Sequence, residues 1–77
     1  MDIQEFVQHF AEQFEETNSS VFAPETRFRE LDEWSSFLAL SIMAMVGEEY
    51  DVALNAAQMR SAQTIQELYD IVSGKLV

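Results

Sequence analysis

The spacing of apolar residues predicts a helix at each end of the chain. In residues 2–16, and again from Thr64 onward, apolar side chains recur every three or four positions, which places them on one face of a helix. The first face comprises Ile3, Phe6, Val7, Phe10 and Phe14, and the second comprises Ile65, Leu68, Tyr69, Ile71 and Val72. Thr64, with Glu67 three residues later, has the pattern of a capping box. We expect Gly74 to end this last helix.

Between these helices the pattern breaks over residues 17–35. The segment Thr17–Ser20 is made of residues whose side chains compete for backbone hydrogen bonds, Pro24 follows, and the apolar residues are spaced irregularly. A segment of this length without a regular element is uncommon in a compact domain and is usually a functional loop. We expect Phe28 and Leu31 to pin this loop onto the helices.

Helical spacing returns in residues 36–50, for which Ser35 or Ser36 is a suitable N-cap. After it, Asn55–Met59 predicts one short helical turn. No stretch shows the alternation of a β-strand. The predicted fold class is therefore all-α: a four-helix bundle of three long helices and one short helix, with a long loop between the first two, forming a single domain over residues 1–77.

The helix predicted over residues 36–50 is apolar around almost its whole circumference. We assign one face to the core, namely Ala39, Ile42, Met43, Val46 and Tyr50. The opposite face carries Phe37, Leu40, Ala44 and Met45 beside Ser41 and Glu48. A helix that is apolar all round is either buried on every side or used for docking, and a bundle this small cannot readily surround one of its own helices. We expect the opposite face to dock a partner or cover a bound apolar chain; the alternative is that the long loop folds over it.

Composition narrows the classes of function. Fourteen acidic residues against four basic ones give a formal net charge of −10, which disfavours nucleic acid and anionic membrane surfaces and favours basic protein partners. The basic residues Arg27, Arg29, Arg60 and Lys75 are too scattered in sequence to predict a basic patch. The absence of cysteine excludes disulfides and thiolate chemistry. With no predicted signal peptide or membrane span, we expect a cytoplasmic protein, and we expect it to be a monomer.

Two segments give the chain a family resemblance. The first is Phe28-Arg-Glu-Leu-Asp-Glu-Trp-Ser-Ser-Phe-Leu-Ala-Leu-Ser-Ile-Met-Ala-Met-Val-Gly-Glu-Glu-Tyr-Asp51, and the second is Thr64-Ile-Gln-Glu-Leu-Tyr-Asp-Ile-Val72. Together they resemble the acyl carrier proteins, in which a Phe and a Leu in the loop precede an Asp-Ser-Leu triplet, an apolar helix and an acidic closing cluster. The resemblance covers nearly the whole chain, with Phe28 and Leu31 matching the loop positions and Ser36 matching the modified serine.

This resemblance implies a non-enzymatic carrier. In the family, a phosphopantetheinyl transferase attaches 4′-phosphopantetheine covalently to the serine, and the thiol of that arm holds acyl groups as thioesters for separate enzymes of fatty acid or polyketide biosynthesis. Ser36 is then the cofactor-binding residue. Partner enzymes with basic docking surfaces are expected to contact Phe37, Leu40, Ala44, Met45, Glu48 and Glu49. No metal is implied.

The attachment triplet departs from the family pattern, because Ser35 replaces the acid and Phe37 replaces the leucine. Counting from Tyr50 backwards selects Ser36, whereas counting forward from Leu31 selects Ser35; we keep Ser36. Acids that relatives carry early in this helix are replaced by Leu38 and Ser41. The remaining acidic residues lie in the loop (Glu25, Glu30, Asp32 and Glu33) and at the end of the helix (Glu48, Glu49 and Asp51).

Three other functions compete with that of a carrier. An enzyme needs a nucleophile with a base, and His9, the only histidine, projects away from the apolar face of its helix and is expected to be a solvent-exposed residue. A calcium-binding loop needs alternating oxygen ligands and a central glycine, which the acidic loop lacks. The third alternative is a carrier fold that is not modified and that binds a protein through its apolar face.

Overall fold

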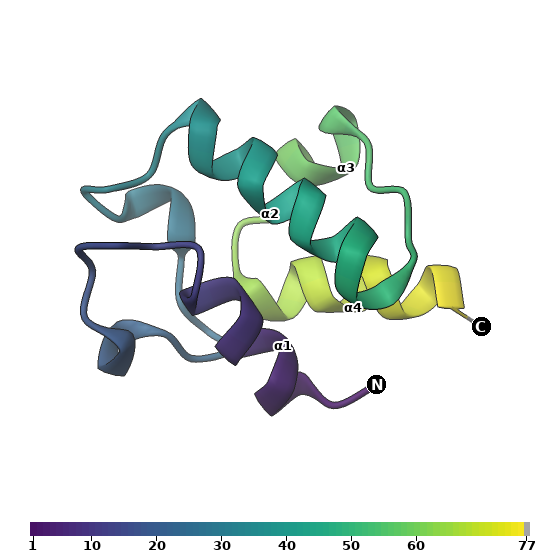
Figure 1. Cartoon of the computed structure of the whole chain (residues 1–77), viewed down its shortest axis with the longest axis horizontal. Coiled ribbons are helices and arrows are strands. Elements are labelled where there is room, and N and C mark those ends of the chain that lie inside the picture. The colour runs from purple at the N-terminus through teal and green to yellow at the C-terminus, as the bar shows by residue number, and fades with distance from the viewer. Residues whose placement is uncertain (77) are drawn as a thin grey trace.

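The computed structural model describes residues 1–76 as four helices connected by loops, without a strand in that range. They are α1 (Ile3–Ala11), α2 (Ser36–Tyr50), α3 (Ala56–Ser61) and α4 (Ile65–Leu76). Figure 1 shows α2 lying across α1 and α4, with α3 beside α2 and the long loop at the end of the bundle where α2 begins. The predicted fold class, three long helices and one short one, is confirmed. No helix of the described part is long and apolar enough to cross a membrane.

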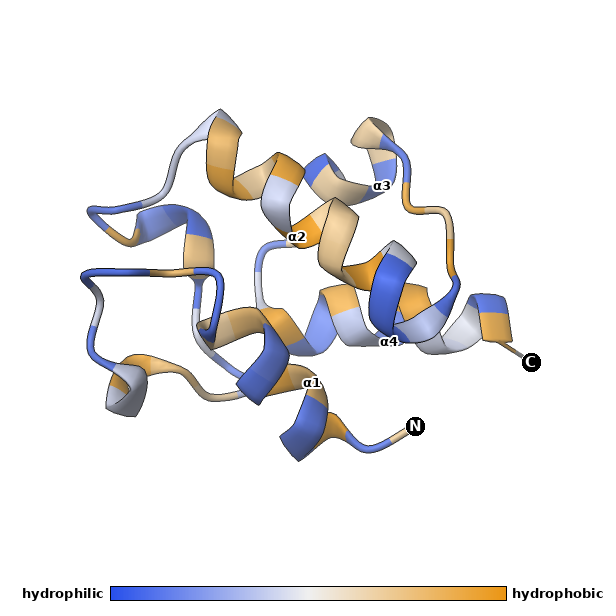
Figure 2. Cartoon of the chain, viewed as in Figure 1, coloured by the Kyte–Doolittle hydropathy of each residue, from blue (hydrophilic) through white to orange (hydrophobic). Residues whose placement is uncertain are grey.

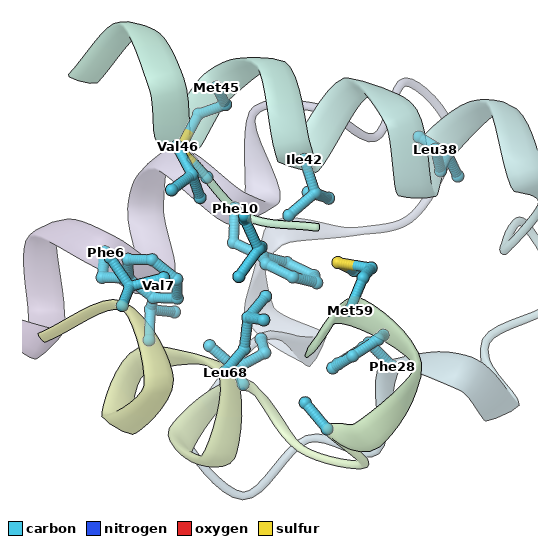
Figure 3. Packing of buried hydrophobic residues seen from close by; sticks show 14 of the residues in the cluster. Phe6, Val7, Phe10, Phe28, Leu38, Ile42, Met45, Val46, Met59 and Leu68 are labelled. Carbon is cyan, nitrogen blue, oxygen red and sulfur yellow. The ribbon is translucent and has the colours of Figure 1, made fainter. Parts of the chain in front are cut away.

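The core is a single cluster to which all four helices and the loop contribute. Figure 3 shows Phe6 and Phe10 of α1, Ile42 of α2 and Leu68 of α4 converging on one another, and all four side chains are fully buried. Phe28 from the loop joins them with no exposed surface. Each such side chain contributes roughly 1.5–3 kcal/mol of burial free energy, which makes them the main source of stability in so small a domain.

Two predicted helix ends are wrong. The first helix stops at Ala11, well before residue 16, and the chain continues in a tight turn in which the Phe14 N–H donates to the Ala11 carbonyl at 3.0 Å. Phe14 is nevertheless buried, because this turn keeps it on the core side. At the other end, Gly74 lies inside α4, which continues to Leu76. An isolated glycine near a helix end is tolerated, so its identity alone does not set the boundary.

The start of α4 confirms the predicted cap in part. The Glu67 N–H donates to the Thr64 hydroxyl oxygen at 3.1 Å, as a capping box requires. The Glu67 carboxylate instead accepts from the Gln63 N–H at 2.8 Å, one residue earlier than the motif predicts. Two further N–H groups at the start of α4 donate to carbonyl oxygens of the long loop. The Ile65 N–H donates to the Thr26 carbonyl, and the Gln66 N–H donates to the Pro24 carbonyl.

The rotation of α2 differs from the predicted one. Its fully core-facing side chains are Leu38, Ile42, Met45 and Val46. Met45 is only 5% exposed and therefore does not belong to the outer, docking face assigned to it from the sequence. Ala39 and Met43, assigned to the core, are only half-buried. The cause is the composition of the helix: apolar residues on all sides leave no amphipathic pattern to fix which side faces inward, as the hydropathy colouring of α2 in Figure 2 illustrates.

Aromatic contacts pin the long loop to the core, although only short 3₁₀ turns (Ser19–Val21 and Phe28–Glu30) interrupt it. The Phe28 ring lies 5.2 Å from that of Phe10 and 4.9 Å from that of Trp34, and Phe14 and Phe22 are 4.9 Å apart. The prediction that Phe28 anchors the loop is confirmed, and Leu31 packs against the same cluster while remaining partly exposed.

The carboxylate of Glu33 joins the later part of the loop to the bend at residues 15–17, which follows α1. It accepts hydrogen bonds from the N–H groups of Glu15, Glu16 and Thr17 at 3.0, 3.2 and 2.9 Å, and from the Thr17 hydroxyl at 2.7 Å. The Thr17 hydroxyl, followed by the backbone donors, holds the pKa of Glu33 below its usual value of 4.5. Glu33 is therefore a structural clamp as well as part of the acidic surface.

At its C-terminal end, α2 is fastened to α1 through His9. The imidazole lies 3.5 Å from Glu5 and from Glu12 and 3.7 Å from Glu49, with its ring edge-on to Tyr50. Its side chain is 22% exposed, so the expectation of a solvent-exposed histidine is wrong. Burial, and next the charges of Glu5 and Glu49, raise the pKa of Tyr50 to about 12. The side of α2 that faces α1 at this end is thus occupied by internal contacts, while Glu48 and Glu49 stay exposed.

Candidate functional site

Two adjacent serines at the start of α2 have different positions in the structure. Ser35 is the N-cap: its backbone is extended, and its hydroxyl oxygen accepts from the Leu38 N–H at 3.3 Å. Ser36 is the first residue inside the helix and is exposed. Its hydroxyl forms no hydrogen bond to any of residues 1–76. The capping role that the sequence left open between the two belongs to Ser35, which leaves the Ser36 hydroxyl available to another molecule.

The surroundings of Ser36 suit an attached phosphate. The first N–H groups of a helix lack partners within the helix, and together with the helix dipole they favour negative charge. The first turn of α2 carries no acidic residue that would oppose it. The aromatic cluster and the Glu33 clamp fix the loop that leads to this turn, so the Ser36 hydroxyl is presented from a well-anchored position.

A surface pocket of about 430 Å³ extends from Ser36 between α2 and α3. Its lining comes from the loop, α2 and α3: Arg29, Trp34, Ser35, Ser36, Ala39, Leu40, Met43, Ala56, Met59 and Arg60. This volume lies within the roughly 300–1,000 Å³ of small-molecule sites, and most of the lining is apolar. The pocket can therefore accommodate a flexible, mostly apolar group that starts at Ser36.

Sequence reasoning missed most of this lining, although part of the signal was present. Ser36, Ala39, Leu40 and Met43 follow helical spacing and so share one side of α2. The sequence pattern assigns Leu40 to the docking face and Ala39 and Met43 to the core. The contributions of Arg29, Met59 and Arg60 depend on how the loop and α3 fold back, which no local pattern encodes.

The outer face of α2 is uncovered. Phe37 is 74% exposed and Leu40 is 64% exposed, and Ala44 is exposed further along the helix. Glu48 and Glu49 are exposed near its end, where Figure 2 shows a hydrophilic segment after the hydrophobic ones. The alternative in which the long loop buries this face is wrong, because the loop packs against α1 through Phe28 and Phe10 and bonds to the start of α4 instead.

An exposed serine at a helix start, beside an apolar pocket and an uncovered apolar face, fits a covalently attached arm and its delivery to partners. No curated protein and no solved structure matches the chain. A family profile described as a phosphopantetheine attachment site matches residues 4–72 of the 77. Proteins of this kind carry a covalently attached 4′-phosphopantetheine and are carriers rather than catalysts. The chain therefore belongs to the phosphopantetheine-attachment family of carrier domains.

Proposed function

We propose that the protein is an acyl carrier whose Ser36 bears the phosphopantetheine arm and whose thioester-bound cargo is passed among enzymes of fatty acid or polyketide biosynthesis. The observation that carries this proposal is that the two serines at the start of α2 differ in role. Ser35 caps the helix, and the exposed Ser36 hydroxyl forms no hydrogen bond to the described residues. The bound arm supplies a thiol for thioester formation, and the protein contributes position and recognition.

Attachment joins the Ser36 oxygen to the phosphorus next to the pantetheine of coenzyme A and releases adenosine 3′,5′-bisphosphate. The serine proton must leave in this step. Because the Ser36 hydroxyl has no acceptor among the described residues, the base that takes up the proton must come from the transferase. The open N–H groups of α2 stabilise the phosphodiester that results.

Intact mass tests the attachment site directly. The protein is incubated with coenzyme A, Mg²⁺ and a broad-specificity phosphopantetheinyl transferase, and Ser36→Ala and Ser35→Ala are treated alongside. We expect a gain of one phosphopantetheine in the parent and in Ser35→Ala and no gain in Ser36→Ala. A gain that is lost only in Ser35→Ala would move the site by one residue, and no gain with several transferases would favour the unmodified interaction module.

We further propose that Phe37, Leu40, Ala44, Glu48 and Glu49 form the docking surface for partner enzymes. Its apolar residues are exposed without an internal partner, which favours contact with another protein. The acids at the end of α2 attract a basic rim on the partner. Met45 is excluded because it is buried.

Separate variants test the apolar and acidic parts of this surface. With the transferase as partner, Phe37→Ala is expected to raise the apparent KM, whereas Val21→Ala, which removes another exposed apolar side chain, leaves it unchanged. Glu48→Lys is cleaner than Glu49→Lys because Glu49 also contacts His9. We expect Glu48→Lys to weaken binding mainly at low ionic strength. Affinity and salt dependence equal to the parent's would remove the acids from the docking surface.

A further inference from the structure

The pocket beside Ser36 holds two of the four basic residues of the chain. Arg29 comes from the loop and Arg60 from α3, and both line the pocket together with Ser36. The expectation that the basic residues are too scattered to gather is therefore wrong for this pair. The chain has a formal net charge of −10, but the two guanidinium groups make this pocket locally positive. The pocket therefore favours binding of an anion.

The two arginines differ in what already binds them. Arg29 donates from Nε to the Ala62 carbonyl at 3.0 Å and from a terminal nitrogen to the Met59 carbonyl, which fixes its guanidinium at the end of α3. Two of its five N–H donors are used in these contacts, so others remain. Arg60 is exposed and has no carboxylate within 4.0 Å among residues 1–76. By contrast, Arg27 lies outside the pocket and pairs with Glu30 at 3.1 Å.

We propose that Arg60 and the remaining donors of Arg29 bind the phosphodiester of the arm at Ser36 and direct the arm into the pocket between α2 and α3. This inference rests on the proposed function, since it needs Ser36 to be the attachment site. A guanidinium matches a phosphate in shape and charge. With the phosphate held at the edge of the pocket, Trp34, Met43 and Met59 form apolar walls along which the rest of the arm lies.

The absence of cysteine supplies a specific probe. In the loaded protein the thiol of the arm is the only thiol, so its reaction with a neutral aromatic disulfide reports how exposed the arm is. The rate is measured on protein shown by intact mass to be fully loaded, and it is divided by the rate for free pantetheine. The ³¹P signal of the phosphodiester is recorded on the same samples and reports contact at the phosphate itself.

Arg60→Ala is compared with the matched variant Arg27→Ala, which removes the same charge outside the pocket. Loss of one exposed charge-assisted contact is expected to speed the thiol reaction of Arg60→Ala by about two- to fivefold and to shift its ³¹P signal. Arg27→Ala should match the parent in both measurements. High salt should bring the parent towards Arg60→Ala.

Thiol rates and ³¹P signals that are the same in the parent and in Arg60→Ala would overturn the inference while leaving Ser36 as the attachment site. Equal changes in Arg27→Ala and Arg60→Ala would also overturn it, because the effect would then follow net charge and not the pocket. Failure of the parent to gain phosphopantetheine is a separate result, which rejects the proposed function before either arginine is tested.

Discussion

The long loop before α2 and the outer face of α2 differ in an unexpected direction. A loop is usually exposed and a helix usually packs against the core, but here the loop is anchored in the core and the helix face is exposed. The loop has only two short 3₁₀ turns, yet Phe28 is fully buried and the Glu33 carboxylate accepts four hydrogen bonds from residues 15–17, which follow α1. The outer face belongs to a regular 15-residue helix, yet it leaves Phe37 and Leu40 mostly exposed. Secondary structure alone therefore does not tell which segment is fixed inside the molecule and which is offered to partners.

The difference between these regions suits a carrier. In the proposed function Ser36 bears the arm and must be held in a defined position, and the anchored loop provides this on one side of Ser36. Partners that act in turn need one accessible surface, and the start of α2 provides it on the other side. Because the aromatic anchors and the Glu33 clamp use residues outside α2, the outer face can remain uncovered without loss of the core.

Two leucines in the same helix give the largest expected contrast. Leu38 is 4% exposed and Leu40 is 64% exposed, although only one residue separates them. Leu38→Ala opens a cavity in the core and is expected to lower the free energy of unfolding by about 2–5 kcal/mol. Leu40→Ala removes no buried contact and should change it by less than about 0.5 kcal/mol. Urea unfolding of the two variants and the parent measures both values.

Binding should show the opposite order. At a temperature where both variants are folded, Leu40→Ala is expected to weaken docking of the transferase more than Leu38→Ala does. If Leu40→Ala destabilises the protein as much as Leu38→Ala, the outer face is part of the internal packing and is not free to dock a partner.

The next largest effect is expected at the Glu33 clamp. Glu33→Gln removes the negative charge and places an amide donor among the N–H groups of Glu15, Glu16 and Thr17, so the protein should unfold at lower temperature. Because the pKa of Glu33 is lower in the folded state, its stabilisation is fully present above the usual value of 4.5 and is lost as the pH falls through the lower, folded-state pKa.

Thermal melts over a pH series check both the size and the sign of this effect. Glu25→Gln removes an exposed carboxylate of the same loop and serves as the control. The melting temperatures of Glu33→Gln and the parent should converge as the pH is lowered below 4.5, whereas Glu25→Gln should follow the parent throughout. A gap between Glu33→Gln and the parent that stays constant with pH would show that ionisation of Glu33 does not contribute.

Sequence patterns predicted those parts of the fold that depend on short-range spacing. The short helix near Asn55–Met59 and the anchoring role of Phe28 are confirmed, with α3 running on to Ser61. The cap at Thr64 is confirmed for its hydroxyl, although the Glu67 carboxylate takes a different donor. The rotation of α2 about its axis could not be predicted from its sequence. Apolar residues lie on nearly every side of this helix, so the pattern does not show that Leu38 and Met45 face the core.

The candidate site likewise contains residues that local sequence patterns predict and residues that they do not. Ser36 was predicted from the resemblance to acyl carrier proteins and from the helix register counted back from Tyr50, which are both signals within one short segment. The meeting of Arg29 and Arg60 in one pocket joins residues 31 positions apart and depends on the return of α3 to the loop. Likewise, the contacts of the Glu33 carboxylate reach back to residues 15–17. Contacts of this kind are set by tertiary packing, and no periodicity in the sequence reports them.

The smallest expected effect is a difference in unfolding free energy between alanine variants of the two adjacent serines. Ser35→Ala loses the hydroxyl that accepts the Leu38 N–H and should cost about 1 kcal/mol of unfolding free energy, since the donor is then left without a cap. Ser36→Ala removes no hydrogen bond, and alanine favours a helix, so a change within about 0.5 kcal/mol is expected. Urea unfolding of the unmodified proteins measures both values. The order should invert in the loading assay, where Ser36→Ala is the variant that fails. If Ser36→Ala were instead the less stable protein, its hydroxyl would be part of the cap, and the separation of a structural serine in the loop from a functional serine in the helix would not hold.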